Sequence, residues 1–495
     1  MSPNGGQALP VRYFCTAASG MERFLVDEVK KKLQAEEVCP LAGKVLFSSR
    51  AKVTSIVQLK SAERIFLLVK HDPPFTLAAQ TNPGCAASAL KSRLLADPEP
   101  WRTAAVTWRV LQRQLSGPHR KVTSLKEELL SWGEAQRLET CAEVRGVFRG
   151  EDDEPGRKRK RRDGLDNERN KKEKSSDKDS EHSAPGRLVG GCTEDSLELK
   201  ASESEDQTPQ QSDEVSFRIS CKCSGALSRC LSVQEISRAL GCGLSRALDW
   251  KVDLKNPQLE VSVYLSDDLC LLGIPLTRLP LASRSYMRTT GLRSTVAWAM
   301  GSLAAIQPGF WVIDPMCGVG TLLIEGAQEH QDVHFLGVDI DDGQLLKASE
   351  NLAFADFGNR IHLLKASSMA LPLSSCSVDA VICDLPFGRK FGTKTSMMAD
   401  LPLILGEMER ILRVGGRLVL LLTPQLSCLL KKLLTPQVSG PPSQLDPRGS
   451  WSVQDTEQAT GLQPLSRLKH QETHRVSLGA IDGLIHTYLK TEPDL

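Results

Sequence analysis

Residues 314–321 read Asp-Pro-Met-Cys-Gly-Val-Gly-Thr, and this stretch decides the fold class of the chain. It follows an apolar, strand-like run at residues 311–313 and leads into a helix-length segment that begins near Leu322. A glycine-rich turn between a parallel strand and a helix lets the backbone approach a ligand closely at the helix N-terminus. We therefore expect an α/β domain that binds a ligand at this turn.

The sequence after this turn alternates between strand-like and helix-like segments. Further apolar runs lie at residues 334–338, 380–383 and 417–422. Strands that alternate with helices argue for a parallel sheet with helices on both faces. The chain closes with two β-prone runs, residues 477–480 and 484–489, which we expect to form an antiparallel hairpin around residues 481–483.

The first half of the chain has the pattern of two small α+β units. The first combines strand-like runs with an amphipathic helix whose apolar residues are Phe24, Leu25, Val29 and Leu33, and the second combines strands at residues 215–220 and 259–265 with a helix at 233–240. The expected order is an α+β unit at residues 8–149, an insert at 150–212, a second α+β part at 213–278 and an α/β domain at 279–495.

The insert at residues 150–212 has no aromatic residue and is rich in Lys, Arg, Glu, Asp and Ser. Such a composition buries too little apolar surface to offset chain entropy, so we expect disorder. Within it, residues Arg157 to Arg162 form an uninterrupted run of six cations. A solvated charge run is one interpretation, but a nuclear import signal or a phosphate-binding tail fits better. We therefore expect a nuclear protein that is also found in the cytoplasm.

Overall composition points to an intracellular protein. The formal net charge is only +2, and residues 1–10 are polar and Gly-rich, unlike a signal peptide. No apolar run approaches the roughly 20 residues that cross a bilayer, so no membrane association is expected. The 14 cysteines are scattered and include no CxxC pair, so we expect reduced thiols and no metal site. The group Cys221, Cys223 and Cys230 is better explained by packing than by zinc.

An acid before the glycine turn indicates which ligand binds there. Asp314 would repel a pyrophosphate but attract the ammonium group of a methionine moiety, which favours S-adenosylmethionine over NAD. Asp339 lies roughly 20 residues beyond the turn, where an acid can accept the ribose hydroxyls. The alternative for Asp339 is a helix cap, but Asp341 and Asp342 are better placed for that role.

A third motif, Asp384-Leu385-Pro386-Phe387-Gly388, follows the strand-like run at residues 378–383. The Asp384 carboxylate and a backbone carbonyl can accept hydrogen bonds from a planar amino group, while Phe387 stacks on the heterocycle. This would aim the nitrogen at the methyl donor, and Asp384 would stabilise the positive charge that develops on it. An ordinary strand-to-loop turn is the alternative. Cys317 and Cys383 have no neighbouring base and are expected to be packing residues.

Taken together, residues 314–321, 337–340 and 384–388 resemble the motifs of the THUMP-domain RNA guanine-N2 methyltransferases. Residues 286–297 resemble the helix that those enzymes place ahead of the first strand, and residues 14–22 resemble the opening of their ferredoxin-like subdomain. The resemblance covers nearly the whole chain except the charged insert. It implies a Rossmann-like catalytic domain preceded by a THUMP RNA-binding module.

The resemblance also assigns roles to individual residues. Cofactor contacts fall on Asp314, Pro315, Gly318, Gly320, Thr321, Asp339 and Ile340. It also implies that Asp384 contacts the target amine and that Pro386 and Phe387 shape the base pocket. After the third strand the family often has Gly-Asp-Ala, but this chain has Lys365-Ala366-Ser367. That departure leaves Ser367 or a backbone carbonyl to contact adenine.

The expected function is S-adenosylmethionine-dependent formation of N2-methylguanosine in a small structured RNA, either a tRNA or a small nuclear RNA. Eukaryotic members of the family also use a small zinc-binding activator subunit, which we expect as a partner here. Two alternatives stay open. The same Asp-x-Pro-Phe turn could serve adenine N6 or a protein glutamine amide, or the chain could be an RNA-binding scaffold whose methyltransferase domain is vestigial.

Overall fold

The structure is a computed structural model that describes residues 10–75, 82–116, 215–386, 394–434, 467–479 and 481–492. The charged insert with its basic run Arg157 to Arg162 lies outside these ranges, and so does Phe387. Disorder of the insert and nuclear import therefore stay predictions. No helix within the described ranges is both long and apolar enough to cross a membrane.

The C-terminal part contains a seven-stranded sheet in the order β11-β10-β9-β12-β13-β15-β14. Its strands are β9 (Trp311–Asp314), β10 (His334–Asp339), β11 (Ile361–Lys365), β12 (Val378–Asp384), β13 (Leu412–Leu422), β14 (Leu468–Ser477) and β15 (Asp482–Lys490). The strands from β11 to β13 are parallel, as the sequence predicts, whereas β15 runs antiparallel to β13. The strand order reverses between β9 and β12, and ligands of open α/β sheets bind at such a point.

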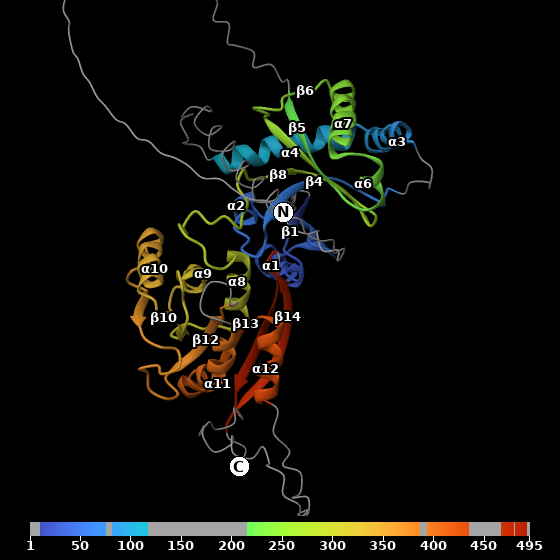
Figure 1. Ribbon diagram of the computed structural model, residues 1–495. Coiled ribbons are helices and arrows are strands. Elements are labelled where there is room, and N and C mark those ends of the chain that lie inside the picture. The colour runs from blue at the N-terminus through green and yellow to red at the C-terminus, as the bar shows by residue number, and fades with distance from the viewer. Residues whose placement is uncertain are drawn as a thin grey trace, which may run out of the picture. The chain divides into compact units, whose positions relative to one another are not determined.

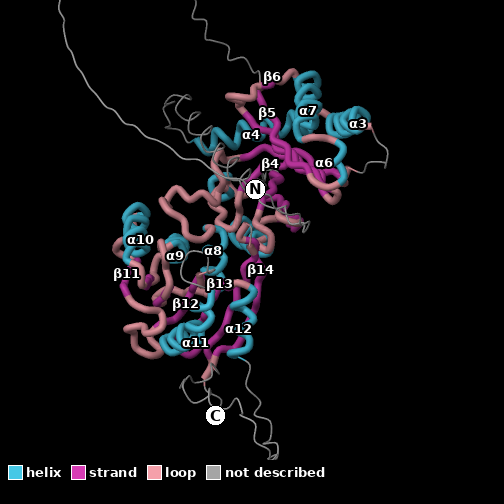
Figure 2. Tube along the Cα trace, viewed as in Figure 1, coloured by secondary structure: helices cyan, strands magenta, loops and turns pink. Residues whose placement is uncertain are grey.

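Helices cover both faces of this sheet (Figures 1 and 2). One face packs against α8 (Ser294–Leu303), α9 (Thr321–Glu329) and α10 (Asp342–Ala355). The other packs against α11 (Lys394–Ile411) and α12 (Pro424–Leu434). Both faces of β12 are therefore buried, which explains why residues 380–383 in its middle are all apolar rather than alternating.

The terminal hairpin exists, but its first strand was placed wrongly. We expected a strand at residues 477–480, whereas β14 ends at Ser477. The polar sequence of β14 hid it, because only one side of this strand is buried. The hairpin also contacts the first helix of the chain, since Ser477 N donates to Ser19 O at 2.9 Å and the His474 ring lies edge-on to Phe24 at 5.2 Å.

The N-terminal part forms one eight-stranded sheet in the order β2-β3-β1-β4-β8-β7-β5-β6. Its strands are β1 (Val11–Thr16), β2 (Glu36–Leu41), β3 (Lys44–Ser49), β4 (Arg64–Asp72), β5 (Ser216–Cys223), β6 (Lys251–Val252), β7 (Leu259–Ser266) and β8 (Leu269–Pro275). The two expected α+β units therefore share a single sheet, because β4 of the first pairs with β8 of the second. The edge strand β2 was missed, since its residues are mostly exposed and it begins with two glutamates and contains a proline.

One face of the eight-stranded sheet carries the helices of this part. They are α1 (Glu22–Leu33), α2 (Val53–Ile56), α3 (Pro83–Leu95), α4 (Glu99–Ser116), α6 (Ala226–Cys230) and α7 (Val233–Leu248). Their buried side chains form a single apolar core with alternate residues of the strands. α3 and α7 lie side by side (Figure 1).

The segment between the two sheets is a strap, residues 284–293, rather than the start of a helix. We expected a helix from residue 286, but α8 begins at Ser294. The strap is fixed by Arg284, whose Nε donates to Glu325 Oε1 at 3.0 Å, while Tyr286 OH donates to the same oxygen at 3.0 Å. Arg284 also donates to the carbonyl of Lys60 at 2.6 Å. Through this ion pair the strap joins the N-terminal part to α9.

We expect Arg284→Met to lower the free energy of unfolding by about 3 kcal/mol, because it leaves the Glu325 carboxylate buried without a counter-charge. The two side chains are only 3% and 1% exposed in the ion pair. Chemical denaturation followed by circular dichroism measures the change. Arg288→Met is the matched control, since Arg288 lies in the same strap but is 66% exposed and only 3.9 Å from Glu350. Equal stability of the two variants would contradict this account.

Candidate active site

Three predicted acids meet at the point where the strand order reverses. Asp314 ends β9, Asp339 ends the neighbouring strand β10, and Asp384 ends β12 on the other side of β9. Carboxyl ends of parallel strands lie at the same edge of a sheet. Asp314 is fully buried, and its pKa is raised well above the usual value by burial and by the negative charges of Asp384 and Asp339. The three carboxylates therefore share one region.

The glycine turn is held in place by one of these acids. Asp339 Oδ2 accepts the N–H of Gly318 at 2.9 Å. Gly318 and Gly320 have φ of +53° and +80°, a conformation that favours glycine, and Pro315 before them is buried. The conformation of the expected ligand-binding turn is thus fixed by a hydrogen bond within the protein.

Asp339 does not cap the helix that follows. Its Oδ1 accepts the N–H of Asp341 at 2.9 Å, and Asp341 in turn caps α10 by accepting from Gln344 N at 2.9 Å. Asp342, the other expected cap, instead pairs with Lys365 at 2.6 Å. Each carboxylate oxygen has two lone pairs, so Asp339 keeps acceptor capacity for ribose hydroxyls.

Asp384 carries an unused acceptor. Its Oδ1 is shielded from solvent and has no hydrogen-bond partner among the residues that the structure describes, although Asp384 as a whole is only half-buried. Burial raises the pKa of Asp384 to about 7. The turn after it is anchored by Leu385 N, which donates to Leu421 O at 3.1 Å. A buried acceptor without a donor is unfavourable, so this atom is suited to a ligand that brings an N–H group.

The remaining residues that the sequence predicted for the cofactor and base sites differ in their surroundings. Thr321 Oγ1 accepts Gly291 N at 3.1 Å, so its hydroxyl holds the strap. Ile340 is 68% exposed beside Asp339, and Ser367 Oγ accepts Met369 N at 3.2 Å in a local turn. Pro386 is half-buried after Asp384, whereas Phe387 lies outside the described residues.

Both cysteines of the motifs are buried and unsuited to nucleophilic catalysis. Burial is the main cause that raises the pKa of the Cys317 thiol and of the Cys383 thiol far above the usual value. A thiol in this state is a poor nucleophile, because the thiolate is the reactive form. The two residues pack inside the apolar cores, as expected.

The sequence analysis missed Asn351, which connects the strap to the glycine turn. This fully buried residue of α10 donates through Nδ2 to Thr289 O at 2.7 Å and to Val319 O at 2.9 Å, and its Oδ1 accepts Thr289 N at 2.9 Å. Every polar atom of the side chain is thus used. The only hint of this role in the sequence is that an asparagine stands inside an expected helix, where asparagine is unfavourable.

A cationic, amino-acid-like cofactor fits these side chains. Three acids at one sheet edge produce a negative potential that an ammonium or sulfonium group would neutralise. The glycine turn adds backbone close to a ligand, and Asp384 offers an acceptor on the side away from Asp339. The arrangement therefore suits transfer of a group from a cation to an amine.

Comparison with known proteins agrees with this chemistry. Residues 282–435 match the family model described as RMKL-like, methyltransferase domain, and residues 192–274 match the THUMP domain. The fold is similar to the crystal structure of TrmN from Thermus thermophilus, with a TM-score of 0.58 and 18% identity over 97% of this chain and 99% of that one. It is also similar to the structure of SMU.472 in complex with SAH, with a TM-score of 0.57 and 12% identity over 98% of this chain and all of that one.

Sequence similarity extends over the whole chain. It is 37% identical to the U6 snRNA (guanine-N(2))-methyltransferase THUMPD2 of Bos taurus, across 99% of this chain and 98% of that relative. This identity over nearly full length, together with the methyltransferase fold and the site above, establishes the family. The chain belongs to the THUMP-domain RNA guanine-N2 methyltransferases.

Proposed function

We propose that this enzyme methylates the exocyclic amino group of a guanine in U6 small nuclear RNA, with S-adenosylmethionine as the donor. The observation that carries the chemistry is the buried, unpartnered Oδ1 of Asp384 at the tip of β12. The choice of U6 small nuclear RNA over tRNA rests on the full-length similarity to a relative that is named for this RNA.

The residues around the glycine turn would hold the cofactor. Asp314 would bind the ammonium group, Asp339 the ribose hydroxyls, and the backbone of Gly318 and Gly320 the methionine portion. Bound S-adenosylmethionine supplies an electrophilic methyl group. The solved structure of the same fold that contains SAH supports this cofactor.

Asp384 is the residue that assists the attack of the target amine on the methyl group. Its carboxylate accepts one N–H of the target amine and fixes the orientation of the nitrogen. As positive charge develops on the nitrogen, the nearby carboxylate stabilises it. Because burial raises its pKa to about 7, Asp384 is also basic enough to take up the proton that the product amine loses.

The surface beside β11 supports the proposed activator partner. β11 is the edge strand of the sheet, and the neighbouring helix α10 exposes Leu346 (64%) and Phe354 (55%), eight residues apart on one helix face. Exposed apolar side chains next to an open sheet edge are typical of a protein interface. We propose that the small zinc-binding activator subunit covers this surface.

We expect Asp384→Ala to lower kcat for U6 RNA methylation by about 10²–10³-fold, because the amine loses its acceptor and its charge stabilisation. Mass spectrometry of nucleosides from RNA treated with purified enzyme measures N2-methylguanosine. Calorimetry with SAH serves as the control and should show little change in affinity. The proposed function fails if the parent enzyme forms no N2-methylguanosine, and the role of Asp384 fails if the variant keeps most activity.

The rate should rise with pH through neutrality. Asp384 is protonated below its pKa of about 7 and ionised above it, and the ionised form is the stronger acceptor. Single-turnover rates from about pH 5.5 to about pH 8.5 measure the profile. In Asp384→Asn, which cannot ionise, the residual rate should lose this rise. A rise of the same midpoint in that variant would assign the titration to another group.

We expect the double variant Leu346→Ser, Phe354→Ser to abolish co-purification with the co-expressed activator subunit, because it makes the apolar face of α10 polar. Thermal unfolding of the isolated chain should stay nearly unchanged, since both side chains are exposed. Val106→Ser, at an equally exposed position of α4, is the control and should keep binding. Full binding by the double variant would place the interface elsewhere.

A further inference from the structure

The eight-stranded sheet has a second face, to which no helix of the described residues contributes buried side chains. Its apolar core is formed only by strand residues, namely Phe14, Leu46, Phe66, Leu68 and Leu271. Tyr264 of β7 lies at the border of this core, half-buried, with its ring edge-on to Phe14 and to Phe66 at 5.9 Å in both cases. The tyrosine is therefore held rigidly at the surface of the sheet.

Two lysines stand next to the Tyr264 ring. The Lys44 Nζ atom of β3 lies 4.8 Å from the ring centroid. Lys222 of β5 is the direct partner of Tyr264 in the parallel pair β5–β7, so both side chains project from the same face. Lys44 is half-buried, and Lys222 is exposed.

The nearby carboxylates are already engaged. Glu260, on the same face of β7, accepts from Arg218 at 2.6 and 3.0 Å. Asp267, in the turn after β7, accepts Ala226 N at 2.8 Å. Neither Lys44 nor Lys222 has an ion pair with any residue that the structure describes.

This leaves an excess of positive charge at Tyr264. Burial lowers the pKa of Lys44, and the positive charge of Lys222 lowers it further. A half-buried cation beside a second cation is unfavourable, and an anion between them would relieve the repulsion. Tyr264 adds a neutral hydroxyl, because burial raises its pKa to about 12, and this hydroxyl can donate to an oxyanion.

We propose that Lys44, Lys222 and Tyr264 form a binding site for a backbone phosphate of the RNA substrate, on the helix-free face of the eight-stranded sheet. The identity of the RNA rests on the proposed function, whereas the preference for a phosphate follows from the two ammonium groups and the hydroxyl. Lysines bind phosphate as point charges, without reading the base, so this contact would position RNA rather than select its sequence.

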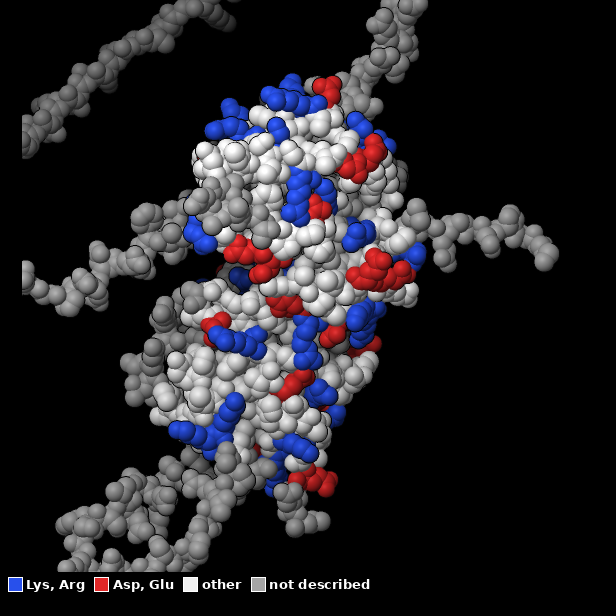
Figure 3. All heavy atoms as spheres, turned by 90° about the vertical axis from the view of Figure 1, so that its right-hand side faces the viewer, with Lys and Arg blue, Asp and Glu red and all other residues white. Residues whose placement is uncertain are grey.

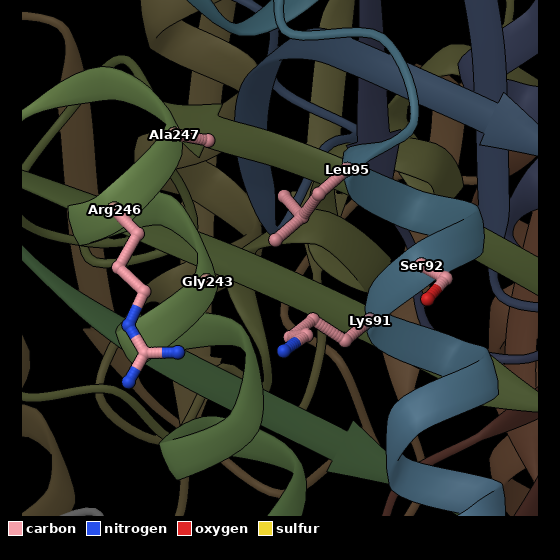
Figure 4. Close-up of a pocket in the computed structure, with 6 residues that line it drawn as sticks. All are labelled: Lys91, Ser92, Leu95, Gly243, Arg246 and Ala247. Carbon is pink, nitrogen blue, oxygen red and sulfur yellow. The ribbon is translucent and has the colours of Figure 1, made fainter.

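A groove between α3 and α7 is the competing site. It is lined by Lys91, Ser92, Leu95, Gly243, Arg246 and Ala247, with the two basic side chains coming from opposite helices (Figure 4). It also holds two cations, but no tyrosine is among its lining residues to add a hydroxyl donor. On the face in Figure 3, basic side chains are interspersed with acidic ones instead of forming one stripe.

The test uses the full chain and a fluorescein-labelled U6 stem-loop RNA, with fluorescence anisotropy over a range of salt concentrations. We expect Lys44→Gln, Lys222→Gln to weaken RNA binding about tenfold and, since one phosphate contact is lost, to reduce the slope of log affinity against log salt by about 0.7–0.9. Lys44→Arg, Lys222→Arg should keep most of the affinity. Lys91→Gln, Arg246→Gln removes the same charge at the groove and should have no comparable effect.

Two further measurements separate this site from the proposed function. SAH affinity by calorimetry should be the same in all variants, and methylation should show a raised KM for RNA with kcat unchanged. Broadening of the ³¹P signal of inorganic phosphate reports anion binding without RNA. The parent chain should broaden this signal, and Lys44→Gln, Lys222→Gln should not.

Each outcome has one meaning. Parent-like RNA binding and salt slope in Lys44→Gln, Lys222→Gln would overturn the site, and so would an equal loss in the groove variant. If the parent chain binds no U6 RNA, the proposed substrate fails, and phosphate broadening alone then decides the site. Broadening that persists after both lysines are replaced would overturn it in that case as well.

Discussion

The contact between the Asp339 carboxylate and the N–H of Gly318 is the interaction on which the rest of the site depends. It ties the tip of β10 to the glycine turn after β9, so two neighbouring strands end in one fixed geometry. Asp314 and Asp384 then lie on either side of the reversal in strand order. Burial is the main cause that raises the pKa of Asp314, and repulsion from the charges of Asp384 and Asp339 raises it further. A cationic ligand would relieve this repulsion, so the acids favour its binding.

The strap, residues 284–293, connects the glycine turn to the N-terminal part. Asn351 bonds the strap to the glycine turn, and Arg284 bonds it to α9 and to the backbone at Lys60. The helix α9 begins at the glycine turn itself. The N-terminal part and the glycine turn are thus connected through short polar contacts of the strap.

The sequence predicted what depends on local pattern and missed what depends on distant pairing. The parallel strands and the acids at their tips were found because apolar runs and turn residues are visible within a few positions. The pairing of β4 with β8 joins residues 200 positions apart, so no local period reports it. The role of Asn351 was hidden for the same reason, because its partners Thr289 and Val319 are distant in sequence. The polar strand β14 was placed wrongly because burial on one side alone left little apolar signal.

The contact of the C-terminal hairpin with α1 has a consequence for synthesis of the chain. Ser19 and Phe24 are among the first described residues to leave the ribosome, but their partners Ser477 and His474 are among the last. Until then α1 exposes part of its apolar surface, including Phe24, and a nascent chain in this state is open to chaperones or to aggregation. The apolar surface of α1 is therefore covered only after β14 has been synthesised, so a chain that terminates before residue 468 would lack β14 and β15 and would also leave Phe24 uncovered.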